Sequence, residues 1–165
     1  MPRDEALPLR VVFDAVGDRL SVEQRSQLMS RVRARDTAPE LALRRALWAL
    51  GVRGWRLHAK DIPGRPDLAF RRRHLAVFVD GAFWHGHPDY YWGQSGAFWD
   101  AKIARNRARD ARVNGALADA GWAVLRLWDF ELDKDAAACA ERVRDALTTR
   151  PPYTNMCSCA VRATK

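Results

Sequence analysis

The stretch DLAFRRRHLAVFVD, residues 67–80, decides how this chain folds. Two short apolar runs, residues 67–70 and 74–79, stand on either side of three consecutive arginines, Arg71–Arg73. This pattern is typical of a β-hairpin whose turn is formed by the arginines. The second run is apolar throughout after its first residue, so we expect it to be a central strand of a sheet.

The hairpin carries one acidic residue at each of its open ends. Asp67 begins the first strand and Asp80 ends the second, so both carboxylates are expected at neighbouring strand ends on one side of the sheet. Carboxylates gathered beyond strand ends commonly hold Mg²⁺ through oxygen ligands. The alternative for Asp67 is a turn-capping role, because a Pro-Asp pair is also an ordinary turn signal.

Helical patterns surround the hairpin in the sequence. Before it, Thr37 and Glu40 form a predicted capping box at the start of a helix that continues through residues 41–50. This box gives Glu40 a structural role that needs no further explanation. After it come a predicted long helix over 98–121, a strand over 122–130 and a closing helix over 136–150.

These elements predict one α/β domain, with a small mixed sheet flanked by helices. The order is helix, strand, strand, helix, strand, helix. We expect the domain to cover residues 25–150, after an N-terminal arm over 1–24 and before a C-terminal tail over 151–165.

The charge balance predicts a polyanionic partner. Lysine and arginine number 28 against 20 acidic residues, which gives a net charge of +8 and favours nucleic acid. The alternative is a basic soluble protein without such a partner. The apolar runs are too short to span a bilayer, so no membrane role is expected. Three cysteines, an odd number clustered late in the chain, favour a reducing cytoplasm: Cys139, Cys157 and Cys159.

The long helix over 98–121 has a mixed inward face. Steps of three and four residues place on that face Ile103, Asn106, Asp110, Val113 and Leu117. A basic stripe lies beside it, made of Lys102, Arg105, Arg109 and Arg112. An inward carboxylate at Asp110 needs an arginine, a protonated histidine or a metal as partner, and a purely structural arginine pair is one alternative.

Aromatic and imidazole side chains follow the hairpin directly. Phe83 and Trp84 form one aromatic pair and Phe98 and Trp99 another, and each pair is either core or a wedge that inserts between DNA bases. His85 beside a carboxylate cluster would act as a general base or acid, since its pKa lies near neutrality. A His-x-His pair without a neighbouring cysteine is a weak zinc signal.

Several short motifs occur in a fixed order between about residues 25 and 130. They are Arg25-Ser26-x-x-Met29, Arg35-Asp36-Thr37-x-x-Glu40, Gly64-Arg65-Pro66-Asp67, Val79-Asp80-Gly81-x-Phe83-Trp84-His85, Phe98-Trp99, Lys102-Ile103, Asn106, Arg109-Asp110 and Gly121-Trp122. In this order they resemble the very short patch repair (Vsr) DNA mismatch endonucleases. The resemblance implies a restriction-endonuclease-like fold, a PD-(D/E)xK variant that lacks the usual acid-x-lysine pair.

The resemblance also implies an activity and a site. The activity is a Mg²⁺-dependent nick in one strand of double-stranded DNA beside a T:G mismatch, as a step of DNA mismatch repair. The implied Mg²⁺ ligands are Asp67 and the Val79 carbonyl, and His85 is the implied general base. The other implied active-site acids are Glu40, Asp80 and Asp110, and the implied wedge residues are Phe83, Trp84 and Trp99. We also expect DNA contacts from Met29, Arg105, Asn106 and Arg109, with Arg112 and the Arg71–Arg73 turn helping to position the DNA backbone.

One feature departs from the family that the chain resembles. Many members bind a structural zinc, but Ala82, Asp89 and Phe130 stand where that site has other ligands, and only His87 of the set remains. One imidazole cannot form a tetrahedral site, so we predict no structural zinc, with apolar packing by Ala82 and Phe130 in its place.

Two other functions remain open at this stage. One is a Vsr-like homing or restriction-type endonuclease that cuts a specific unmismatched sequence. The other is a non-catalytic DNA-binding relative. For the nicking enzyme we expect a monomer in the bacterial cytoplasm, associated with the nucleoid, with other mismatch-repair proteins as further partners.

Overall fold

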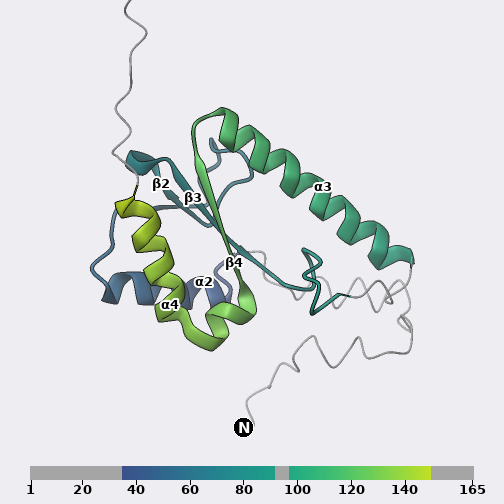
Figure 1. The fold of residues 1–165 in the computed structure, drawn as a ribbon, viewed down its shortest axis with the longest axis horizontal. Helices are drawn as coiled ribbons and strands as arrows, with labels where there is room; N and C mark the ends of the chain where they lie inside the picture. The colour runs from purple at the N-terminus through teal and green to yellow at the C-terminus, as the bar shows by residue number, and fades with distance from the viewer. Residues whose placement is uncertain (1–34, 92–96, 150–165) are drawn as a thin grey trace, which may run out of the picture.

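The computed structural model of the chain describes residues 35–91 and 97–149 (Figure 1). At its centre is a four-stranded mixed sheet in the order β1-β2-β3-β4. The strands are β1 (Arg56–Leu57), β2 (Leu68–Phe70), β3 (Leu75–Asp80) and β4 (Ala123–Trp128). Strand β2 pairs antiparallel with both β1 and β3, whereas β4 pairs parallel with β3. This confirms the predicted small mixed sheet.

The hairpin of β2 and β3 forms as predicted. Leu68 pairs with Val77 and Phe70 pairs with Leu75, and a short 3-10 turn over Arg71–Arg73 joins the two strands. His74 closes this turn in the left-handed backbone region. Strand β3 is nearly fully buried between β2 and β4, which confirms its central position.

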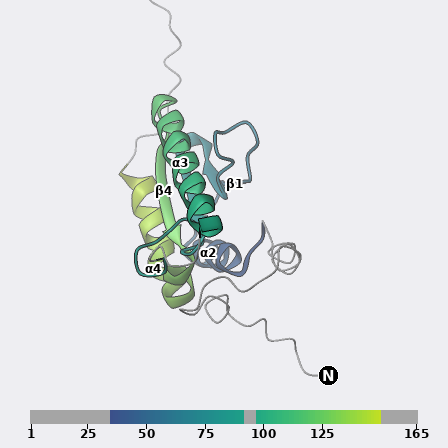
Figure 2. The ribbon, with the colours of Figure 1, turned by 90° about the vertical axis from the view of Figure 1, so that its right-hand side faces the viewer.

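In the part of the chain that the structure describes, three helices cover the two faces of the sheet. Figures 1 and 2 show α3 (Ala97–Asp119) on one face and α2 (Ala38–Ala49) beside α4 (Asp129–Thr148) on the other. The period of two along β3 divides its side chains between these layers. Leu75 and Val77 pack in the core under α2 and α4, whereas Ala76 and Phe78 pack in the core under α3.

Two boundaries differ from the prediction. Strand β4 ends at Trp128 rather than at residue 130, because the Glu131 carboxylate accepts a hydrogen bond from the Trp128 N–H at 2.9 Å and starts α4 there. Asp135 interrupts α4 with non-helical dihedral angles and caps the next turn through the Ala138 N–H. The predicted start at residue 136 is therefore the start of the second part of α4.

One strand was not predicted, and several predicted segments lie outside the described residues. Strand β1 was not predicted, because its two residues are too short and too exposed to give a pattern. The arm over 1–24, Met29 and the tail over 151–165 lie outside the described residues. Within the described ranges no helix is long and apolar enough to cross a membrane.

Candidate active site

An open pocket of about 410 Å³ lies at the open end of the hairpin, on the face of the sheet that α3 covers. We call it the acidic pocket. One group of charged and imidazole lining residues comes from the position before β2, the end of β3, the loop after β3, helix α3 and strand β4: Asp67, Asp80, His85, Arg109, Asp110 and Arg126. Arg35, His58 and Arg65 also line the pocket. The structure thus brings together four of the five predicted catalytic residues, which are far apart in the sequence.

Asp67 lies just before β2 with its side chain largely buried. Its Oδ2 accepts a hydrogen bond from the Val79 N–H at 2.7 Å, across the hairpin. The pKa of Asp67 is raised to about 6, mainly by burial and also by the nearby carboxylates of Glu40 and Asp80, while the Val79 hydrogen bond opposes the shift. A carboxylate with a raised pKa is short of positive charge, which is the electrostatic setting of a cation ligand.

His85 is held by an acid from α3. Its Nδ1 lies 2.5 Å from Asp110 Oδ2, and its Nε2 lies 3.7 Å from Asp80 Oδ1. Because an ionised carboxylate only accepts hydrogen bonds, the proton of the short contact belongs to Nδ1, which leaves Nε2 as the basic nitrogen. The sequence predicted that Asp110, on the inward face of α3, needs a partner, and His85 is one such partner.

Arg126 is a site residue that the sequence analysis missed. It projects from β4, and its Nη1 lies 2.7 Å from Asp80 Oδ2 and 3.4 Å from Asp110 Oδ2. Burial raises the pKa of Asp80, while His85 and Arg126 oppose that shift. The available signal was a single arginine inside the otherwise apolar strand AVLRLW, because a charge in such a strand needs a buried partner.

Glu40 lies behind the acidic pocket, not in its lining. Its carboxylate accepts hydrogen bonds from the N–H of Asp36 at 3.0 Å, the N–H of Thr37 at 3.4 Å and the hydroxyl of Thr37 at 2.9 Å. The helix-start role of Glu40 is thereby confirmed. It reaches the pocket through His58, whose Nε2 is 3.8 Å from Glu40 Oε2 and whose Nδ1 is 3.7 Å from Asp67 Oδ1.

His58 was also missed, and nothing in its sequence neighbourhood marks it. It has a positive φ of 45°, a backbone conformation that is uncommon outside glycine. It could add a nitrogen ligand near Asp67. The set Asp36, Glu40 and His58 is close enough to hold a metal, but Arg44 already binds the Asp36 carboxylate at 2.5 Å.

The aromatic residues after the hairpin form one cluster with the start of α3. Phe83 and Trp84 are partly exposed, whereas Trp99 has 0% exposed surface and packs against both, with centroid distances of 5.6 and 5.5 Å. Trp99 therefore lies in the core beneath the pair and does not stand at the surface as a wedge. Asn106 donates a hydrogen bond from Nδ2 to the Trp84 carbonyl at 2.8 Å, which fixes this loop on α3.

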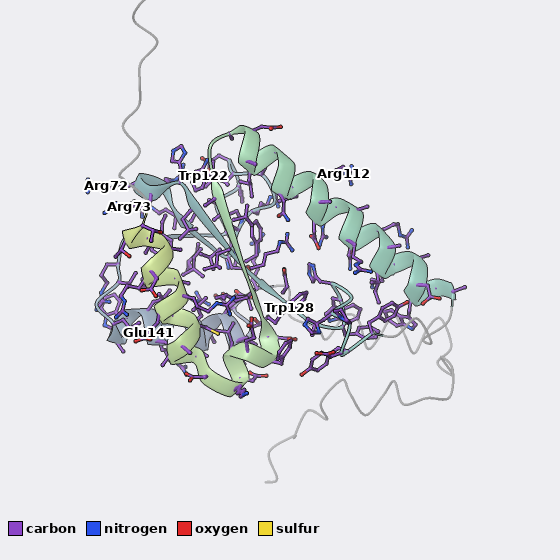
Figure 3. All side chains as sticks on the ribbon, viewed as in Figure 1. Arg72, Arg73, Arg112, Trp122, Trp128 and Glu141 are labelled. Carbon is purple, nitrogen blue, oxygen red and sulfur yellow. The ribbon has the colours of Figure 1, made fainter. Side chains whose placement is uncertain are left out.

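The arginines of the predicted basic stripe on α3 differ in their position relative to the acidic pocket. Arg109 lines the acidic pocket and is half exposed, while Arg105 is exposed on the same helix. Arg112 points away from the body of the protein (Figure 3). The turn that carries Arg72 and Arg73 lies at the end of β3 opposite Asp80, so these arginines do not line the pocket.

Comparisons with known proteins identify the family. The family model of the DNA mismatch endonuclease Vsr matches residues 17–91. Type II nicking enzyme V.NmeDIP of Neisseria meningitidis serogroup C is 47% identical over 137 residues, which cover 79% of this chain and 90% of that protein. The chain belongs to the Vsr family. Its restriction-endonuclease-like fold is therefore confirmed, and it is a DNA nicking endonuclease that hydrolyses a phosphodiester bond.

Two further relatives of this Vsr-family enzyme carry different names. Type II nicking enzyme V.XorIIP of Xanthomonas oryzae pv. oryzae (strain KACC10331 / KXO85) is 47% identical over 134 residues, covering 79% of this chain and 96% of the relative. DNA mismatch endonuclease Vsr of Escherichia coli (strain K12) is 35% identical over 127 residues, which is 75% of each chain. The two type II nicking enzymes named here are therefore more similar to this chain than the Escherichia coli enzyme is.

The position of the family's structural zinc is filled by rings and a methyl group in this Vsr-family chain. Ala82 is buried, and the His87 ring meets Trp128 at 4.8 Å and Phe130 at 5.1 Å between centroids. Tyr90 stacks on Phe130 at 4.8 Å. Among the described residues the donor set does not fit zinc, because His87 is the one ligand of the family set that is retained, and its Nδ1 already accepts a hydrogen bond from the Asp89 N–H at 3.2 Å.

A hard divalent cation does fit the acidic pocket. Asp67 offers carboxylate oxygens in a partly buried position with a raised pKa, and the Val79 main chain is beside it. Oxygen ligands of this kind suit Mg²⁺, which retains several waters when bound. The family's dependence on a metal is thus compatible with this chain's own residues.

Proposed function

We propose that this chain nicks one strand of fully paired DNA at a specific short sequence, as a type II nicking enzyme of the Vsr family. The identity of 47% to two proteins of that name supports this proposal, since an enzyme named Vsr itself is 35% identical. The proposed endonuclease domain covers residues 25–150 and acts as a monomer, because a nick requires one active site.

In the proposed site, Asp67 and the Val79 carbonyl would hold Mg²⁺. When bound, the cation neutralises charge on the scissile phosphate and stabilises the leaving oxygen. Asp67 is suited to this role because its carboxylate is buried and receives a single neutral hydrogen bond, from Val79, among those found in the described ranges. His58 and Glu40 extend this side of the site by contacts of 3.7 and 3.8 Å.

His85 takes the proton of the attacking water in the proposed reaction. Its Nδ1 is engaged by Asp110 at 2.5 Å, so Nε2 is the nitrogen that accepts the proton. The carboxylate of Asp110 then stabilises the imidazolium that forms, as in other acid–histidine pairs. The products are a 3′-hydroxyl and a 5′-phosphate.

The DNA backbone would lie along the exposed side of α3. Arg105 and Arg109 supply positive charge there, and Arg109 also borders the acidic pocket, with Nη2 3.5 Å from Asp110 Oδ1. Such contacts position DNA without reading its sequence and make binding steeply dependent on salt. The partly exposed Trp84, with Lys102 Nζ 5.0 Å from its ring centroid, is the proposed contact to the bases.

A genome-wide nicking experiment tests this proposal. Purified protein is incubated with Mg²⁺ and unmodified bacterial DNA, and single-strand breaks are mapped by sequencing the free 3′-hydroxyl ends. We expect breaks that recur at one short sequence and disappear with His85→Ala. An enzyme that cuts no paired DNA under these conditions contradicts the proposal.

The second candidate is a nick beside a T:G mismatch, and the aromatic cluster favours it. Trp84 and Phe83 are adjacent, partly exposed and close to the acidic pocket, which is the arrangement of side chains that unstack base pairs. Labelled duplexes that differ by one T:G pair separate the two functions. Cleavage of the mismatched duplex alone assigns the enzyme to mismatch repair.

A further inference from the structure

Two carboxylates from different elements converge on a single nitrogen in the acidic pocket. Asp80 ends β3 and Asp110 lies midway along α3, yet Oδ2 of each contacts Arg126 Nη1, at 2.7 and 3.4 Å. The same Asp110 oxygen lies 2.5 Å from His85 Nδ1. A cationic group therefore stands at the point where the two acids meet.

The Arg126 side chain is held on its remaining sides. Its Nε donates a hydrogen bond to Asn114 Oδ1 at 3.3 Å, and its guanidinium carbon lies 4.9 Å from the centroid of the Phe78 ring. The side chain is 21% exposed. Because the guanidinium is fixed by an amide, a ring and two acids, it is a permanent part of the site and not a surface group that reaches outward.

On the Asp67 side of the pocket, Arg35 and Arg65 contribute to the lining, but among the described residues neither forms an ion pair with Asp67. In the described ranges, Asp67 has no lysine or arginine within ion-pair distance, and its close contacts are the Val79 N–H and the His58 ring. The described part of the pocket thus contains two acids that share an ion pair with one guanidinium and one acid, Asp67, that has no such ion pair. Two carboxylate oxygens that meet at one point are themselves a donor set for a hard divalent cation.

We infer that the Arg126 guanidinium occupies a second cation position between Asp80 and Asp110, so that the pocket takes a divalent cation at Asp67 alone. Arg126 is then a positioning residue, which acts through Asp110 to hold His85. This inference deepens the proposed function and rests on it for the role of His85, but the occupancy of the cation positions can be measured without DNA.

The test counts bound Mn²⁺ on the purified full-length protein by electron paramagnetic resonance. We expect Arg126→Gln to bind one more Mn²⁺ per chain than the wild type, because it removes the guanidinium that Asp80 and Asp110 share. The double variant Arg126→Gln with Asp80→Asn should lose the added ion. Arg142→Gln is the matched control, since Arg142 also pairs with an acid, Glu131, at 2.8 Å on helix α4 outside the pocket.

Activity gives a second readout that a merely structural arginine would not produce. In Arg126→Gln the turnover rate for nicking should fall by roughly 10-fold to 100-fold, with little change in the KM for DNA, and high Mg²⁺ should restore part of it. Arg126→Lys, which keeps one charge, should bind the wild-type number of ions. If Arg126→Gln unfolds without metal, millimolar Mn²⁺ should restore the fold, because the ion replaces the lost charge.

The outcomes separate this inference from the proposed function. An Arg126→Gln protein that is folded and binds the wild-type number of ions overturns the inference, as does one that remains unfolded at every Mn²⁺ concentration. Asp67→Asn should lose the ion that the wild type binds. If it does not, the proposed metal site at Asp67 is wrong, whatever the result for Arg126.

Discussion

Replacement of Asp67 by asparagine should stabilise the metal-free protein while it abolishes nicking. Burial raises the pKa of Asp67 from 3.8 to about 6 in the folded state. A difference of about 2 pKa units corresponds to roughly 3 kcal/mol of unfavourable free energy for the ionised carboxylate. Asparagine carries no charge, and its amide oxygen still accepts the Val79 N–H bond. We therefore expect a gain of up to about 3 kcal/mol in unfolding free energy at neutral pH.

The sign of the pH dependence follows from the raised pKa. Below about pH 4 the carboxyl is protonated in both the folded and the unfolded chain, so Asp67 and asparagine differ little. As the pH rises from about 4 to about 6, the unfolded chain releases its proton first, and the wild type loses stability relative to the variant. Above about pH 6 the difference stays constant.

Urea unfolding of both proteins in a chelator, at several pH values between about 4 and 8, measures this difference. Added Mg²⁺ should reduce it, because the cation stabilises the ionised carboxylate of the wild type alone. The reasoning fails if Asp67→Asn is no more stable than the wild type at pH 7, or if the gap between them is the same at pH 4. Asp61→Asn is a matched control, since Asp61 is exposed and its ion pair with Arg71 lowers its pKa.

Three further predictions follow from the site. His85→Ala should lower the single-turnover nicking rate by roughly 10²-fold to 10⁴-fold with DNA affinity unchanged, and a wild-type rate would remove His85 from the reaction. Trp84→Ala should reduce discrimination between mismatched and paired duplexes with little loss of unfolding free energy. Replacement of the buried Trp99 by alanine should lower the unfolding free energy by about 3–5 kcal/mol, measured by urea unfolding. Equal losses of unfolding free energy would show that both tryptophans belong to the core. Elemental analysis should find no stoichiometric zinc, because aromatic rings surround His87.

Local pattern was sufficient to predict the hairpin and the two acids at its open end. Alternating or continuous apolar runs report burial directly, and the turn arginines could not lie in a buried strand. The inward position of Asp110 followed in the same way from the period of a helix. Each of these predictions depends on residues close together in the sequence, which is why they agree with the structure.

Contacts between distant segments could not be predicted from such patterns. The sequence around Arg126 does not indicate which acid it pairs with, because Asp80 is 46 positions earlier. The parallel pairing of β3 with β4 brings the two residues together. The same limit applies to His58, whose place between Glu40 and Asp67 depends on a short strand, β1, that has no periodicity.

The mixed sheet itself explains why the site forms where it does. Along β3 the residues that face α3 are Ala76, Phe78 and then Asp80, so an apolar face becomes acidic within a single step at the end of the strand. Parallel pairing places Arg126 of β4 opposite Phe78, one step before that acid. Antiparallel pairing on the other side brings the beginning of β2, with Asp67, to the same edge. Because β3 pairs antiparallel with β2 and parallel with β4, the sheet brings two acids to one edge: Asp80, which is paired with Arg126, and Asp67, which has no lysine or arginine partner among the described residues. The inferred single cation position at Asp67 depends on this difference between the two acids.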